Sequence, residues 1–238
     1  MDINSAFQLA LSVLPPISLS VLPSMIDLFK ENCARYQAHC LKVQERAKQL
    51  AEESSKNIDN IPNQYKIENP KSSILLPTIQ TSLLYLEENE IRKMFSKLIA
   101  ASFDSRKANV LHPGFISMIS QLSPNDARIL NKINNSDNIL GICCIKDNME
   151  YPIIECELVK ELTIEQFALS MINLKRLEIL TFNSHLLNSN NVYISTALSR
   201  QKINGSLLEY INSQGYEAYT NDVYFTKLGE SFLKVCID

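Results

Sequence analysis

The segment from Ile74 to Leu130, ILLPTIQTSLLYLEENEIRKMFSKLIAASFDSRKANVLHPGFISMISQLSPNDARIL, decides the fold class of this chain. Apolar residues recur in it at helical spacing between polar or proline-marked breaks, which predicts four helices. These helices cover residues 76–86, 90–103, 113–122 and 124–134. Pro113 and Pro124 suit the first position of a helix, where the missing N–H would have had no partner. Ser123 is the expected N-cap of the last helix, and Asp126 adds negative charge to its first turn.

Upstream of this segment, residues 3–26 contain no charged side chain. Pro15, Pro16 and Pro23 cut the segment into pieces shorter than the ~20 apolar residues that a membrane-spanning helix needs. No basic residue precedes it, so a signal peptide is not expected. Two interpretations stay open, a buried packing element or a segment that lies in a membrane interface. The absence of Lys and Arg before Lys30 favours burial.

A long helix is predicted over about 24–56, because apolar residues recur there with alternating spacings of four and three. Such a heptad seam requires a helical partner, either within the chain or from a second copy. A homo-oligomer would form through Phe29, Tyr36, Val43 and Leu50. Residues 57–73 are polar and contain two prolines, which predicts an extended connector.

Beyond residue 135 the pattern changes to short strands mixed with helices. Strands are predicted over 139–145, 150–156, 179–183, 192–196 and 222–225. Thr163 and Gln166 form a capping box that opens a helix to about residue 177. A helix over 206–213 ends near Gly215, and Thr226 caps a last helix. From 123 to 236 this order resembles a winged-helix domain.

The predicted fold is therefore α+β and mainly helical, with an N-terminal helical hairpin or bundle followed by a winged-helix-like C-terminal domain. Three domains are expected, over residues 1–57, 58–122 and 123–238. The whole chain has a net charge of −3. Residues 1–122 carry 13 Lys and Arg against 12 Asp and Glu, and residues 123–238 carry 10 against 14. The C-terminal part is thus acidic, with a net charge of −4.

DNA binding is the function that a winged helix first suggests. The helix that would enter the major groove offers Lys175 and Arg176 as cations, against Glu165 and Glu178. Binders of DNA neutralise several phosphates with Lys and Arg, so a neutral helix in an acidic domain disfavours nucleic acid as the partner. The six cysteines lack C-x-x-C spacing, which favours reduced thiols and a cytoplasmic protein.

The chain from about residue 58 to residue 130 resembles the Abi-alpha family, a group of bacterial proteins named for abortive infection, a form of phage defence. The segment IPNQYKIENP is similar to the proline-bracketed lead-in of that family. The recognisable pattern continues through seven positions, which are Asp104, His112, Pro113, Phe115, Leu122, Ser123 and Pro124. The resemblance implies a role in phage defence and brings no catalytic role with it.

Asp104 and His112 bracket a loop that also holds Arg106 and Lys107. An acid, a base and two cations in one loop are the groups that phosphoryl chemistry uses. The structural alternative is that Asp104 caps a turn and His112 caps the helix that begins at Pro113. No second carboxylate cluster and no metal-ligand spacing accompanies them, so we expect no catalytic, cofactor or metal site.

The sequence thus favours a non-enzymatic phage-defence protein that acts through contacts with a phage or host protein. Three alternatives belong to other classes. The first is a winged-helix DNA-binding regulator that uses Lys175 and Arg176. The second is a membrane-associated effector that inserts residues 3–26 through peripheral contact. The third is an enzyme centred on Asp104 and His112.

Overall fold

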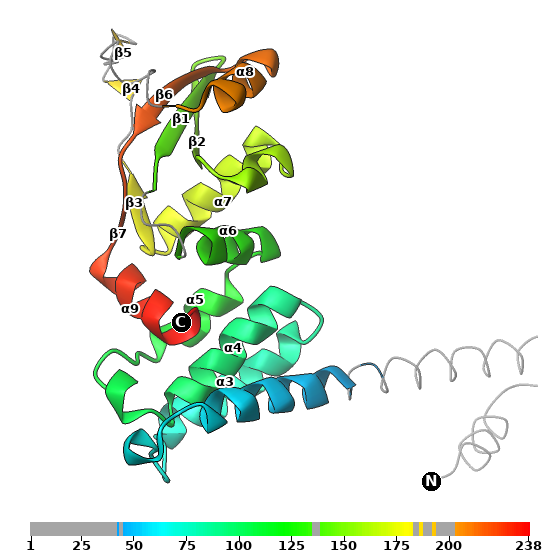
Figure 1. Ribbon diagram of the computed structural model, residues 1–238, viewed down its shortest axis with the longest axis vertical. Coiled ribbons are helices and arrows are strands. Elements are labelled where there is room, and N and C mark those ends of the chain that lie inside the picture. Colours follow the sequence, from blue (N-terminus) through cyan, green and yellow to red (C-terminus); the bar gives the residue numbers. More distant parts are fainter. Residues whose placement is uncertain (1–41, 43–44, 135–138, 183–185, 188–191, 194–202) are drawn as a thin grey trace, which may run out of the picture. The chain divides into compact units, whose positions relative to one another are not determined.

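The computed structural model describes residues 42, 45–134, 139–182, 186–187, 192–193 and 203–238 (Figure 1). The chain divides into two compact units, residues 1–46 and residues 47–238. The second unit is α+β and mainly helical, which confirms the predicted fold class. The uncharged segment 3–26 and the seam residues Phe29, Tyr36 and Val43 lie outside the described residues.

The first part of the second unit is a set of helices around α4. Residues 47–59 are helical. The elements that follow are η1 (Asn63–Tyr65), α3 (Ser72–Ser82), η2 (Leu83–Tyr85), α4 (Asn89–Ala101), η3 (Ser105–Lys107), α5 (Gly114–Ser120) and α6 (Pro124–Asn134). Helix α4 contacts α3, α5, α6 and α9, which is why its Ile91, Phe95 and Leu98 have no exposed surface.

The four predicted helices are confirmed, and their capping explains where they begin. The Ser123 hydroxyl accepts the N–H of Asp126 at 3.2 Å, and the Asp126 carboxylate accepts the N–H of Ser123 at 2.8 Å. This reciprocal cap fixes the start of α6. The predicted start of the first helix was wrong, because α3 begins at Ser72 and contains Pro77.

The connector predicted over residues 57–73 was only partly right. Its first residues complete the preceding helix, and η1 adds one 3-10 turn. Two contacts then tie the segment to the loop after α4: Ile67 donates its N–H to the Phe103 carbonyl at 2.8 Å, and Lys66 forms an isolated bridge with Asp104. The polar composition does not indicate these contacts, because backbone hydrogen bonds do not depend on the identity of the side chains.

The remaining elements alternate strands with helices. They are β1 (Gly141–Lys146), β2 (Met149–Ile154), η4 (Glu157–Lys160), α7 (Ile164–Arg176), β3 (Leu180–Phe182), β4 (Leu186–Leu187), β5 (Val192–Tyr193), α8 (Gly205–Ser213), β6 (Glu217–Asn221), β7 (Val223–Phe225) and α9 (Lys227–Cys236). The strands form antiparallel sheets of order β2-β1-β6, β3-β7 and β4-β5.

Local sequence explains most of these boundaries. Asp147 and Asn148 both adopt positive φ, which closes the β1–β2 hairpin with a two-residue turn that matches strand twist. The capping box of Thr163 and Gln166 is present at the start of α7. Gly215 adopts a φ of 81° where α8 ends, as predicted. Strand β6 was not predicted, because its residues do not alternate between apolar and polar.

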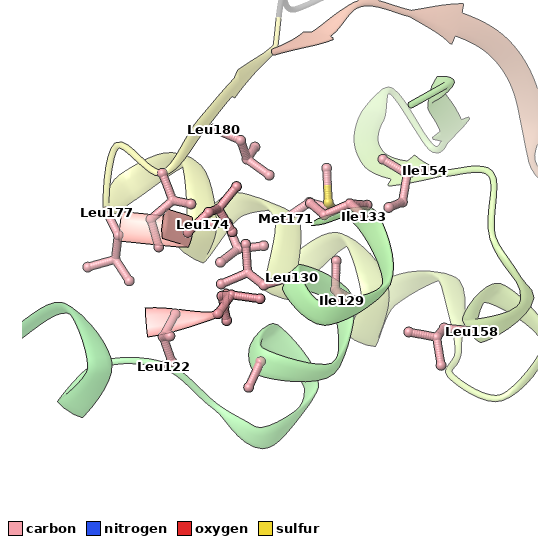
Figure 2. Close-up of a cluster of buried hydrophobic side chains, with 14 of the residues drawn as sticks. Leu122, Ile129, Leu130, Ile133, Ile154, Leu158, Met171, Leu174, Leu177 and Leu180 are labelled. Atoms are coloured by element: carbon pink, nitrogen blue, oxygen red, sulfur yellow. The ribbon is translucent and has the colours of Figure 1, made fainter. Parts of the chain in front are cut away.

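One large hydrophobic core runs through this unit, from Leu50 to Ile237, and a small second cluster joins Cys143, Ile145 and Tyr219. In Figure 1, α6 and α7 lie between the helices around α4 and the sheet β2-β1-β6. Figure 2 shows how their side chains meet, with Ile129 and Ile133 of α6 beside Met171 of α7. Residues on both sides of position 122 therefore bury their apolar surface in the same cluster.

Candidate functional site

A polar cavity lies where the end of helix 47–59, α4 and the loop after α4 meet. Its volume is about 240 Å³. The charged side chains that line it come from distant positions, Lys97, Asp104, Arg106, Lys107 and Asp238. Only the Asp104-to-Lys107 group is continuous in sequence.

Asp104 is held by its neighbour Arg106 in a two-pronged ion pair. Arg106 donates from Nε to Oδ1 at 2.9 Å and from Nη2 to Oδ2 at 2.7 Å, and its backbone N–H donates to Oδ1 at 3.0 Å. These side-chain hydrogen bonds lower the pKa of Asp104 despite its burial. The guanidinium also lies 4.9 Å from the ring centroid of Tyr65. Asp104 thus caps a turn, as the structural alternative predicted.

Lys97 and Lys107 bring two ammonium groups to the same cavity. Lys97 projects from α4 and donates to the backbone carbonyl of Ile237, while Lys107 ends η3. Burial lowers the pKa of both lysines, and the carboxylate of Asp238 partly offsets that effect. Sequence reasoning missed Lys97 and Asp238 as members of a site, since no local motif links positions so far apart.

A second cavity of about 450 Å³ adjoins the first, with Asn57 and Lys97 lining both. Its lining combines the buried thioether of Met94 with polar groups such as Asn131 and Ser96. Asn57 donates to the Ser96 hydroxyl at 3.1 Å, which ties helix 47–59 to α4 at this point.

His112 does not line either cavity. Its Nδ1 accepts the N–H of Gly114 at 3.0 Å, so it caps α5 as the structural alternative predicted. Phe115 is fully buried and meets the ring of Phe232 edge-on, with 5.5 Å between centroids. The structure therefore places Asp104 and His112 in separate local roles within the pattern that the sequence singled out.

The two cations named as possible DNA contacts make intramolecular bonds. Lys175 donates to the Phe182 carbonyl at 2.8 Å and lies 4.3 Å from the centroid of that ring. Arg176 donates to Asn173 and to Gln121. Beside them, Leu169 of α7 is 69% exposed.

A larger apolar surface lies on α3 and η2. We call it the α3 stripe; it consists of Leu76, Ile79, Leu83 and Leu84, all exposed. The first three recur at helical spacing, so they share one side of the helix. The opposite side, with Ile74 and Thr78, is buried, as expected for a helix that packs on α4 and α5.

Among the residues that the structure describes, no three His, Cys, Asp or Glu side chains gather as metal ligands would. Within the same ranges, no helix has the length and apolar character needed to cross a membrane. Cys143, Cys144 and Cys236 are buried free thiols.

Comparison with known proteins identifies the family to which this chain belongs. No curated protein and no solved structure shows significant similarity to this chain. The sequence profile of the family described as Abortive infection alpha matches residues 42–236. That match covers most of the chain, including the α3 stripe, the strands that follow and every residue that lines the polar cavity except Asp238. The chain therefore belongs to the Abortive infection alpha family.

Proposed function

We propose that the protein acts in phage defence without catalysing a reaction, through contact with a phage or host protein. Membership of the Abortive infection alpha family supports the biological setting. The observation that carries the mechanism is the α3 stripe, because four large apolar side chains are exposed on two consecutive elements.

The exposure of the α3 stripe has a free-energy cost that binding would remove. Leu84 is 80% exposed and Leu76 is 57% exposed. Burying one such side chain stabilises a complex by about 1.5–3 kcal/mol. Contiguous apolar patches on soluble proteins mark interaction sites more often than scattered single residues do. An apolar, uncharged surface selects a protein partner over a nucleic acid, whose binding is dominated by phosphate charge.

The winged-helix interpretation of the C-terminal part belongs to the same proposal. Strand β6 pairs with β1, and β7, one residue further on, pairs with β3. The segment β6–β7 thus pairs with β1 and then with β3, and α7 directly precedes β3, an order that supports a winged-helix-like domain. Exposed Leu169 and Ile172 and the internal bonds of Lys175 favour a protein contact over a DNA groove for α7.

The test replaces two members of the α3 stripe. Leu76→Glu with Leu83→Glu should abolish phage protection and remove a partner from pull-downs of infected cells. Met149→Glu is the matched control, because Met149 is 56% exposed at the start of β2 and far from α3 in sequence. Thermal unfolding should stay unchanged in both variants. Full protection by the double variant would refute the proposed surface.

A separate experiment tests the DNA-binding alternative. Lys175→Ala with Arg176→Ala would lower affinity for duplex DNA if α7 contacted phosphates, and the loss would weaken as salt rises. We expect no gel-shift by the unaltered protein even at low salt. Tight, salt-dependent binding of DNA would refute the proposed protein contact of α7 and support a DNA contact in its place.

A further inference from the structure

Two half-buried lysines face the 240 Å³ cavity from different elements and bring two positive charges to one site. Partial burial removes water from an ammonium group and disfavours its charge. Lys97 also lowers the pKa of Lys107 by repulsion. An uncharged residue at position 97 or 107 would avoid that cost, yet both positions carry a lysine.

The carboxylates near the cavity leave these lysines incompletely neutralised. Both oxygens of Asp104 are occupied by Arg106. The exposed carboxylate of Asp238 accepts a hydrogen bond from Asn134 at 2.8 Å. The Lys107 ammonium makes no hydrogen bond or ion pair with any residue that the structure describes. Three cationic side chains therefore face two carboxylates around the cavity.

We propose that the protein binds a phosphate-bearing small organic molecule here, with its phosphate between Lys97, Lys107 and Arg106. Asp104 uses Nε and Nη2 of Arg106, which leaves the Nη1 donors of that guanidinium for a ligand. A phosphate accepts several charge-assisted hydrogen bonds at once, and Lys and Arg are its usual partners in proteins.

The adjoining cavity provides room for the organic part of the molecule. It measures about 450 Å³, within the range of small-molecule sites. Met94 contributes an apolar side chain to its lining, and the amides of Asn57 and Asn131, which donate to Ser96 and Glu90, make the rest of the lining partly polar. Because Asn57 and Lys97 line both cavities, one molecule would span them. Inorganic phosphate would fill only the first.

The contributions of the two cavities can be measured separately by calorimetry. The full chain is titrated with inorganic phosphate, with adenosine monophosphate and with adenosine. We expect the nucleotide to bind at least about tenfold more tightly than inorganic phosphate, which equals about 1.4 kcal/mol. Adenosine should show no binding at the same concentration. If neither phosphate nor the nucleotide binds at millimolar concentration, the proposal is refuted. Equal affinity for both would refute the role of the second cavity.

Three variants assign the binding to this cavity. Lys107→Gln should weaken nucleotide binding about tenfold, since a hydrogen bond to a charged group is lost. Asp238→Asn should strengthen it, because a competing negative charge disappears. Lys234→Gln removes an exposed cation of α9 that does not line the cavity, so affinity should not change. Equal losses in the Lys107 and Lys234 variants would mean general charge attraction and overturn the site.

The Lys107 variant keeps the test independent of folding. This side chain makes no intramolecular hydrogen bond that its replacement would break, so the melting temperature should match that of the parent. A second readout is the pKa of Lys107, followed by NMR of reductively methylated protein. Phosphate bound beside the ammonium should raise that pKa, whereas an unchanged pKa at saturating ligand would contradict direct contact.

Discussion

At the scale of single residues, Asp104 combines burial with a full set of hydrogen bonds. Its side chain is 3% exposed and pairs with Arg106 at 2.7 Å. Because the pKa of Asp104 is lower in the folded than in the unfolded chain, its charge stabilises the fold at neutral pH. That contribution is complete above the unfolded pKa of about 3.9 and is lost as pH falls through the lower folded pKa.

Replacing this carboxylate should therefore change stability in a pH-dependent way. We expect Asp104→Asn to lower the free energy of unfolding at pH 7 by about 1.5–3 kcal/mol, the usual value for hydrogen bonds to a charged group. The difference between variant and parent should shrink below about pH 4, where Asp104 takes up a proton in the unfolded chain before it does so in the folded parent. Urea denaturation of both proteins at pH 7 and below about pH 4 measures this difference in the free energy of unfolding. A difference that is independent of pH would contradict the ion-pair account.

The buried thiols give a second prediction at this scale. Burial raises the pKa of Cys144 to about 12 and raises the pKa values of Cys143 and Cys236 as well. Only the thiolate reacts with alkylating agents, so these thiols should resist iodoacetamide at pH 8 in the folded protein. After unfolding in urea all three should be alkylated within minutes. Peptide mass spectrometry would identify each site, and rapid labelling of Cys236 before unfolding would contradict the packing of α9.

At the scale of elements, α9 approaches the chain before β3 at a glycine. A Cβ added at Gly229 would lie 1.8 Å from the carbonyl oxygen of Ile179, closer than any real contact. Thr226 reinforces the approach, since its N–H donates to the same carbonyl at 3.2 Å and its hydroxyl caps α9. Helix α9 can therefore take this position only because residue 229 has no side chain.

Two glycine substitutions test this close approach. Gly229→Ala should destabilise the protein by about 1–3 kcal/mol or more, because backbone must move to admit the methyl group. Gly205→Ala is the control, since no atom lies within 4 Å of its added Cβ at the start of α8. Alanine there should leave stability unchanged or raise it by up to about 1 kcal/mol. Chemical denaturation would measure both, and equal effects would show that α9 tolerates displacement.

At the scale of the whole molecule, residues 47–238 hold their own core. The described side chains of the core cluster from Leu50 to Ile237 belong to this unit. A chain of this length buries enough apolar surface to fold as an independent unit. We expect a fragment of residues 47–238 to unfold in one cooperative thermal transition followed by circular dichroism. A fragment that lacks a transition would show that residues 1–46 are required for the fold.

Local sequence determined much of this protein by itself. The helix over 124–134 and the caps of α7 and α9 were all predicted where the structure has them. Each depends on interactions within a few residues, such as a hydroxyl that accepts an N–H three positions ahead. The capping hydrogen bonds of Asp104 and His112 also join residues two positions apart, so the sequence alone could indicate them.

Only the tertiary structure decided which distant groups meet. Strand β6 was missed because pairing with β1, rather than its own pattern, makes it a strand. The meeting of Lys97, Lys107 and Asp238 around one cavity follows from the packing of α4 against α9, across more than a hundred residues of chain. Side-chain periodicity encodes which face of an element is buried, but burial against a particular partner depends on the complementary shape of both surfaces.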